Sequence, residues 1–289
     1  MIYAMDGTAL TDAFDIDGEQ LNVAFDIEGN DVYHSWFDEI TVEKNRDPST
    51  STAYYVVTIP QTRPNGTKQY PFVFAPNGAD GGTMSTLTMM KNYHFYLGMN
   101  GGYFDAFQTG SLKPYGITIQ NSVLIREATE QYFLTNYTLT IDGDGKLGYA
   151  DTMQSGVTAQ DVLDSGAVSS LLGLVPLVVN GQPSGVSSTQ WTSTEKLQRQ
   201  IIGQYSNGDY VVITCEGKDF DSSPGFTITE VQNLCLSMNL DFAMAVDGGG
   251  STETVIGNEQ INTIYENTTG RIVPTFIVFN GTDTFGVPR

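Results

Sequence analysis

The segment Asn100-Gly101-Gly102-Tyr103-Phe104-Asp105 and the later segment Asp247-Gly248-Gly249-Gly250-Ser251-Thr252 each follow an apolar, strand-like run directly. Both place glycines beside carboxylate, amide or hydroxyl groups. Glycine adopts positive φ angles and lets a ligand come close to the backbone. The two segments therefore predict a site at strand ends for an oxygen-rich, phosphorylated substrate.

The rest of the chain has the pattern of a strand-rich fold. Tyr and Phe number 15 each and Gly 31, a mixture that favours strands and turns over long helices. A turn at Pro64-Asn65-Gly66 predicts that the strand after it returns alongside the strand before it. We expect strands at residues 53–59, 70–75, 94–99, 115–119, 123–125, 137–141, 147–150, 174–179, 210–215, 242–246 and 273–279, the last of which closes the sheet.

Helices are expected at three places. One covers residues 85–93, and a second follows Thr158, whose hydroxyl would cap a first turn that contains Asp161. The third begins at the capping box Thr227-Ile228-Thr229-Glu230 and continues with apolar residues at the spacing of one helix face. Few helices among many strands predict an α+β fold with a strand-rich mixed sheet core.

Residues 1–45 differ from the rest of the chain. The sequence Ala13-Phe14-Asp15-Ile16-Asp17-Gly18 recurs as Ala24-Phe25-Asp26-Ile27-Glu28-Gly29, and both copies have the pattern of an acidic strand and turn. Two copies do not make a solenoid. We expect an acidic N-terminal extension over residues 1–45 and a single domain over residues 46–289. The extension either serves attachment, in a virion or a homo-oligomer, or packs on the main domain.

The charge of the chain restricts its partners. It has 33 acidic and 13 basic residues and a net charge of −20. Broad binding to nucleic acid is therefore disfavoured, and an anionic substrate needs a local basic pocket. The acidity also favours solubility through self-repulsion. Its two Asp-x-Asp-Gly sequences lack the spacing of an EF-hand calcium loop. The sequence therefore predicts no definite cofactor, and binding of a divalent cation is an alternative.

Cysteine and histidine are scarce. Cys215 and Cys235 lie on expected core elements, so we predict buried free thiols, with a single disulfide as the alternative. His34 and His94 are the only histidines, which argues against a histidine-based triad or a zinc site. The N-terminus does not have the pattern of a signal peptide, and no apolar run reaches membrane length. We expect no membrane insertion, and a location outside the cell or on a virion.

Eight short motifs occur in the order typical of one enzyme family. Besides the two glycine segments they are Ser85-Thr86-Leu87, Pro114-Tyr115-Gly116-Ile117, Pro176-Leu177-Val178-Val179-Asn180-Gly181, Arg199-Gln200-Ile201-Ile202-Gly203, residues 225–231 and Gly270-Arg271-Ile272-Val273. Over about residues 53–280 the chain thus resembles the phosphodiester glycosidase family. It departs from the family pattern at Glu216, where Asp is usual, and at Glu253, which interrupts a run of Ser and Thr. Residues 1–45 lie outside the resemblance and are weakly similar to leader segments of bacteriophage tail-associated proteins.

The resemblance implies a hydrolase that cleaves the bond between the anomeric carbon of a sugar and a phosphodiester oxygen. Its partner would be a phosphate-containing glycan or cell-surface polymer. Such a reaction needs cations for the phosphate and a carboxylate for the sugar or the water. Asp247 and Asp105 are the candidate catalytic carboxylates, with Glu216 and Glu253 in reserve.

The same resemblance implies a set of substrate-binding residues. Arg199 and Arg271 are the phosphate candidates, because a planar guanidinium matches two phosphate oxygens at once. The other candidates are the amide, hydroxyl and glycine residues of the two segments: Asn100, Gly101, Gly102, Gly248, Gly249, Gly250, Ser251 and Thr252.

Each of these residues has an alternative, purely structural role. The arginines would serve equally well as structural salt bridges, and the aspartates would bond backbone N–H groups in tight turns. For the whole protein, the alternative to an enzyme is a glycan-binding module in which Trp36 and Trp191 stack on sugars, or a structural virion or tail protein. Hydrolysis of a sugar-1-phosphodiester would distinguish an enzyme from a glycan-binding module and from a structural protein.

Overall fold

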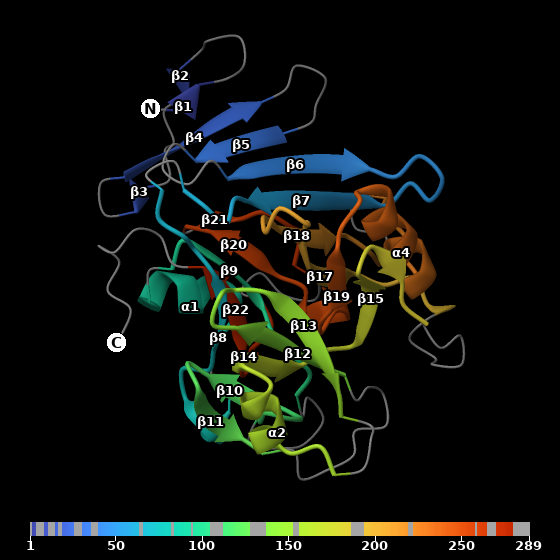
Figure 1. Cartoon of the computed structure of the whole chain (residues 1–289). Coiled ribbons are helices and arrows are strands. Elements are labelled where there is room, and N and C mark those ends of the chain that lie inside the picture. The colour runs from blue at the N-terminus through green and yellow to red at the C-terminus, as the bar shows by residue number, and fades with distance from the viewer. Residues whose placement is uncertain are drawn as a thin grey trace.

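Three antiparallel sheets pack around a shared apolar core (Figure 1). The computed structural model describes the following residues in full: 40–63, 66–81, 84–93, 95–104, 112–127, 137–152, 156–185, 194–218, 222–257, 259–264 and 270–279. Before residue 40 it describes the backbone of five short segments: 2–3, 9–10, 15–16, 19–25 and 31–35.

The largest sheet has ten strands. Its order is β16 (Gln182–Pro183), β15 (Val175–Val179), β19 (Phe242–Ala245), β17 (Arg199–Gln204), β18 (Tyr210–Cys215), β7 (Ala53–Ile59), β6 (Thr41–Arg46), β5 (Asp31–Ser35), β4 (Glu19–Phe25) and β3 (Asp15–Ile16). The N-terminal strands thus extend the sheet of the main body, because β5 pairs with β6 and β6 pairs with β7. A separate pair joins β1 (Ile2–Tyr3) to β2 (Ala9–Leu10).

Two five-stranded sheets complete the body. One has the order β11 (Val123–Arg126), β10 (Thr118–Gln120), β14 (Ala167–Leu172), β12 (Tyr137–Asp142) and β13 (Leu147–Asp151). The other has the order β21 (Glu259–Gln260), β20 (Thr254–Ile256), β9 (Leu97–Asn100), β22 (Phe276–Phe279) and β8 (Pro71–Phe74). The second of these sheets contains β9, which ends at Asn100.

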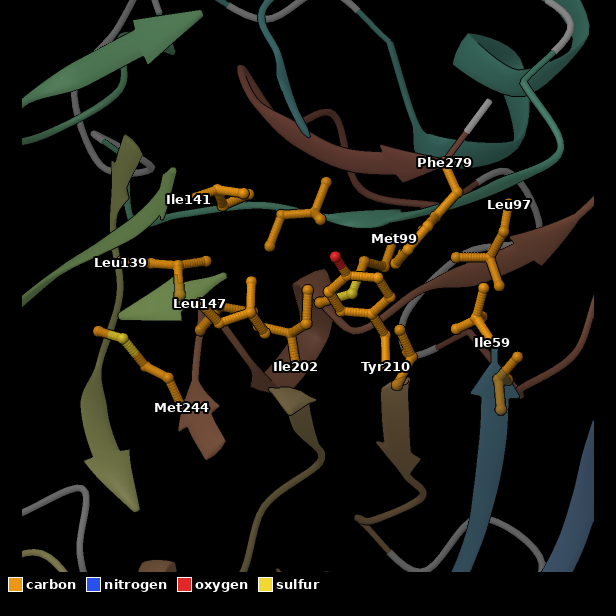
Figure 2. Packing of buried hydrophobic residues seen from close by; sticks show 14 of the residues in the cluster. Ile59, Leu97, Met99, Leu139, Ile141, Leu147, Ile202, Tyr210, Met244 and Phe279 are labelled. Carbon is orange, nitrogen blue, oxygen red and sulfur yellow. The ribbon is translucent and has the colours of Figure 1, made fainter. Parts of the chain in front are cut away.

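The central core lies between the large sheet and the two smaller ones. Figure 2 shows side chains from all three sheets meeting around Tyr210, whose ring lies 5.5 Å from that of Phe279. Ile202 and Met244 enter this core from β17 and β19, while Leu139 enters from β12. Their removal from water supplies the main stabilisation that holds the sheets together.

Three helices with described bounds cover the outside: α1 (Thr86–Tyr93), α2 (Ala159–Asp164) and α4 (Ile228–Ser237). The capping boxes predicted at Thr158 and Thr227 are both confirmed, each with its acidic partner three residues later. Helix α4 packs on the outer face of the large sheet (Figure 1), where Cys215 and Cys235 belong to one apolar cluster. Both cysteines are buried and free, as predicted, and burial raises the pKa of the Cys235 thiol to about 12.

The α+β expectation is confirmed, and the pairs among the described strands are antiparallel rather than mixed. Both predicted hairpins, β10 with β11 and β12 with β13, are present. The expected return of 70–75 alongside 53–59 is wrong: β8 pairs with β22, because both edges of β7 are already bonded to β6 and β18. The expectation that residues 273–279 close the sheet is also wrong, because β22 lies between β9 and β8. None of the helices in the described part of the chain is long and apolar enough to cross a membrane.

Candidate active site

The two glycine segments meet at the ends of β9 and β19, held together by Asn100. The Asn100 side-chain Nδ2 donates to the backbone carbonyl of Asp247 at 2.7 Å, and its Oδ1 accepts from the backbone N–H of Glu253 at 3.1 Å. The backbone N–H of Asp247 in turn donates to the carbonyl of Gly101 at 3.3 Å. Asn100 is 1% exposed, so its carboxamide fixes both ends of the segment that starts at Asp247.

Between those ends the chain forms a tight turn. Residues Gly249–Ser251 make one turn of 3-10 helix, and Gly249 has a φ of 58°, a conformation that glycine adopts without strain. The backbone N–H of Gly249 donates to the carbonyl of Gln198 at 3.0 Å. A Cβ at Gly248 would lie 2.8 Å from that same carbonyl oxygen. The turn is therefore pressed against the residue that precedes β17.

Asp247 presents a buried carboxylate at the start of this turn. It is 8% exposed, and burial raises its pKa to about 6. Hydrogen bonds from the Ser251 hydroxyl and the Gly248 backbone, together with the positive charge of Arg271, act in the opposite direction but do not cancel the effect of burial. A carboxyl group with such a pKa changes its protonation state near neutral pH, which suits a general acid or base.

Arg271 directly follows Gly270, and its side chain lies against the turn. A Cβ at Gly250 would lie 2.3 Å from Arg271 Nη2, so the guanidinium rests directly on the bare backbone of this glycine. Arg271 Nη1 also lies 3.4 Å from the Ser251 hydroxyl. The structure thus places one of the two predicted arginines beside the Asp247 carboxylate.

Arg199 has a different environment. It is buried, its Nε donates to the carbonyl of Phe226 at 2.8 Å, and its Nη2 donates to the carbonyl of Glu195 at 2.7 Å. Burial lowers its pKa, and electrostatic interactions, of which that with Tyr103 is the largest, act in the opposite direction. Two of its donor groups are bonded to backbone carbonyls, so this guanidinium links β17 to the segments around Glu195 and Phe226.

Gly101 and Gly102 face protein rather than open space. A Cβ at Gly101 would lie 2.6 Å from Thr275 Oγ1, and one at Gly102 would lie 2.4 Å from the carbonyl of Leu172. These two glycines therefore permit the chain after β9 to pack closely against Thr275 and Leu172. Asp105, the second predicted catalytic carboxylate, lies outside the described residues.

The two reserve acids are both buried near the turn. Glu253 accepts bonds from the backbone N–H groups of Thr86, at 2.9 Å, and Leu87, at 3.1 Å, at the start of α1. Burial raises the pKa of Glu253, while these bonds lower it. Glu216 Oε1 accepts from the backbone N–H of Thr263 at 2.8 Å.

Asn262 connects the Glu216 region to the turn. Its Nδ2 donates to the carbonyl of Thr252 at 3.0 Å, and its Oδ1 accepts from the N–H of Thr254 at 2.9 Å. Since Thr263 bonds to Glu216, the carboxylate of Glu216 and the end of the turn lie against the same short segment. Sequence reasoning missed Asn262 and also Gln198, although Gln198 directly precedes a recognised motif.

Metal ligation is not evident in the part of the chain that the structure describes. There, no group of three or more His, Cys, Asp or Glu side chains is placed to hold a metal ion. The arrangement around Asp247 offers instead buried carboxylates, the guanidinium of Arg271 and the hydroxyl of Ser251.

These features agree with a family comparison. A model of the phosphodiester glycosidase family matches residues 93–280, which contain both glycine segments and both arginines. The chain belongs to this family. The match covers the turn at Asp247 and the carboxamide of Asn100 that holds it.

Solved structures have the same fold. The catalytic domain of zebrafish N-acetylglucosamine-1-phosphodiester α-N-acetylglucosaminidase, auto-inhibited by its pro-peptide, aligns with a TM-score of 0.63 and 18% identity, over 83% of this chain and 82% of that one. A hypothetical protein from Synechocystis aligns with a TM-score of 0.59 and 14% identity, over 91% of this chain and 64% of that one. A putative exported protein from Burkholderia pseudomallei aligns with a TM-score of 0.58 and 13% identity, over 79% and 74% of the two chains. At these identities the likeness concerns the fold.

One curated relative is similar in sequence. It is the SPbeta prophage-derived uncharacterized protein YomE of Bacillus subtilis strain 168. The two sequences are 29% identical over 164 residues, which is 56% of the present chain. The chain spans a quarter of the length of that relative.

Proposed function

We propose that this protein hydrolyses the glycosidic bond of a sugar-1-phosphodiester. The observation that carries the proposal is the Asp247 carboxylate, buried with a pKa near 6 and flanked by Arg271, inside a family-matched segment. A carboxylate that titrates near neutral pH suits proton transfer. A guanidinium beside it suits a phosphate group.

In the proposed reaction, water attacks the anomeric carbon of the sugar. The bond between this carbon and the water oxygen forms, while the bond between the carbon and the phosphate oxygen breaks. The leaving phosphomonoester takes the electron pair, and Asp247 accepts the proton from water. Phosphate is an acidic leaving group, so protonation of the leaving oxygen is not required. Arg271 stabilises the negative charge that the leaving phosphate gains.

A second carboxylate would stabilise the positive charge that develops on the sugar ring. Glu216 is our candidate, since it stands where the family usually has Asp and its Oε1 is held in place by the Thr263 N–H at 2.8 Å. The Asp105 assignment stays a prediction.

The substrate that we propose is a phosphate-containing glycan or cell-surface polymer, encountered outside the cell or by a virion. Support for the sugar comes from the activity named for the zebrafish protein, which acts on an N-acetylglucosamine-1-phosphodiester. Support for the setting comes from the prophage origin of the Bacillus relative and the exported character given to the Burkholderia protein. Residues 1–45 stay our candidate for attachment or assembly.

The test is release of a phosphomonoester from sugar 1-(methyl phosphate) diesters by the wild-type protein and by Asp247→Asn. We expect turnover by the wild type and a loss of about 10²-fold or more in kcat for the variant, the usual scale for a positioned acid or base. Binding should change less, because Arg271 still faces the phosphate. Binding of these diesters without turnover by the wild type would instead support a glycan-binding module, and neither binding nor turnover would favour a structural virion protein.

A further inference from the structure

Two buried polar side chains beside the Asp247 turn have no hydrogen-bond partner among the described residues. They are Gln198, at both Oε1 and Nε2 of its carboxamide, and Thr252, at its hydroxyl. Gln198 is 1% exposed and Thr252 is 3% exposed, so solvent does not satisfy these groups. A buried polar group without a partner destabilises a fold, so such groups in native proteins call for an explanation.

The two side chains belong to the same neighbourhood. The Gln198 carbonyl accepts from Gly249, and the Gly249 carbonyl accepts from the N–H of Thr252 at 3.1 Å. Two residues further along each segment, Gln200 Nε2 donates to the Thr254 hydroxyl at 3.0 Å. Gln198 and Thr252 are thus connected through the backbone of Gly249, and the residues two positions later in each segment are in direct contact.

Gln200, two residues after Gln198, is a glutamine with a structural role and serves as a comparison. It is fully buried on β17, and its Nε2 donates to the hydroxyls of Thr214, at 3.2 Å, and Thr254. Its Oε1 lacks a partner among the described residues, but its amide nitrogen joins two strands. The carboxamide of Gln198 makes no corresponding contact, although it is equally buried.

We infer that Gln198 and Thr252 are sugar-recognition residues, whose polar groups bond the ring hydroxyls of the glycone in the bound state. This inference rests on the proposed function. The chemistry of the two groups selects the sugar rather than the phosphate: both are uncharged, and each can donate and accept, as a hydroxyl can. Arg271, which lies against Gly250, is the cation for the phosphate.

Asn100 fixes the two ends of the turn, so access to these groups requires the three glycines between those ends to shift. Gly248, Gly249 and Gly250 are partly exposed, and three successive glycines give this backbone more conformational freedom than any other sequence would. The free protein then carries two unsatisfied residues that the substrate satisfies. A site that hydrogen-bonds a substrate hydroxyl discriminates strongly against an analogue that lacks it.

The experiment compares Gln198→Met with the matched control Gln200→Met, and Thr252→Val with Thr254→Val. We expect Gln198→Met and Thr252→Val to leave the melting temperature unchanged or raise it, because an apolar group replaces an unsatisfied one. Their kcat/KM on a sugar 1-(methyl phosphate) diester should fall about tenfold, the equivalent of one hydrogen bond. The two control variants should lower the melting temperature instead, with kcat/KM per folded molecule nearly unchanged.

A second arm uses monodeoxy diesters, each without one ring hydroxyl. Loss of the hydroxyl that meets Gln198 should lower kcat/KM in the wild type but not in Gln198→Met. An active wild type with unchanged kcat/KM in Gln198→Met, or a melting temperature that falls as far as in Gln200→Met, overturns the inference. If the wild type neither binds nor hydrolyses any diester, the proposed function fails and the sugar assignment fails with it.

Discussion

The side-chain amide of Asn100 donates to the backbone carbonyl of Asp247 at 2.7 Å, across 147 residues of sequence. The same carboxamide accepts from the N–H of Glu253, so one buried side chain spans the two ends of the Asp247–Thr252 turn. Both polar ends of Asn100 are therefore bonded to protein. Asn100 was a candidate for substrate binding, but these contacts favour a role in positioning Asp247.

Asn100→Asp should lower both stability and activity. The change preserves shape but replaces the Nδ2 donor with an oxygen that faces the Asp247 carbonyl. We expect a loss of about 1–3 kcal/mol in the free energy of unfolding, the usual cost of an unsatisfied buried group, measured by urea denaturation. Asn121→Asp adds the same charge at an exposed turn and should have little effect. Equal stability of the two variants would contradict the positioning role.

The pH dependence of turnover should reveal the titration of Asp247. A general base acts in its ionised form, and burial raises the Asp247 pKa to about 6. We expect kcat to fall as the pH drops through about 6, measured at saturating substrate between pH 4 and pH 8. A limb near pH 4, typical of an exposed carboxylate, would show that Asp247 is not the group that titrates.

Asp247 should also make the fold less stable at neutral pH. Its folded-state pKa of about 6 lies above the ordinary value of 3.8 for an aspartate, so between these values the folded protein binds more protons than the unfolded chain. Stability contributed by this group is thus present below about pH 4 and is lost as the pH rises through 6. Asp247→Asn should therefore raise the melting temperature at pH 7.5 by a few degrees and much less at pH 4. A lower melting temperature at pH 7.5 would indicate a structural aspartate.

Arg271 should act on both the phosphate and Asp247. Arg271→Lys keeps the charge but loses the planar fork, so kcat/KM should fall about tenfold, and Arg271→Ala should fall further. Because the cation lowers the pKa of Asp247, its removal in Arg271→Ala should also shift the acidic limb of the pH profile upward. Arg46→Lys, at a distant exposed strand, is the control. An unshifted acidic limb in Arg271→Ala would show that Arg271 does not influence the pKa of Asp247.

Much of the local structure was predictable because it depends on residues close in sequence. The capping boxes at Thr158 and Thr227 satisfy N–H groups three residues away, and both are present. The hairpin of β12 and β13 follows from the turn at residues 142–145 in the same way. The motifs that contain Asp247 and Arg271 likewise drew attention to these two residues, whose roles in catalysis and binding stay predictions.

The errors concern partners that are distant in sequence. The turn after β7 predicted a hairpin, but β8 pairs with β22, which lies about 200 residues further on. The assignment of Arg199 as a phosphate ligand stays a prediction, and two of its donor groups bond the carbonyls of Phe226 and Glu195. Sequence does not state which backbone group a buried guanidinium will meet.

The sequence alone determined the strand-rich class, the capped helices and the glycine segments at strand ends, since these follow from side-chain size, spacing and the freedom of glycine. Tertiary structure alone decided that Asn100 bridges Asp247 to Glu253, that Arg271 covers Gly250, and that Gln198 is buried without a partner. The physical reason is that burial and hydrogen-bond satisfaction belong to the packed sheets. They arise only when segments that are not neighbours in the sequence exclude water from the same small volume.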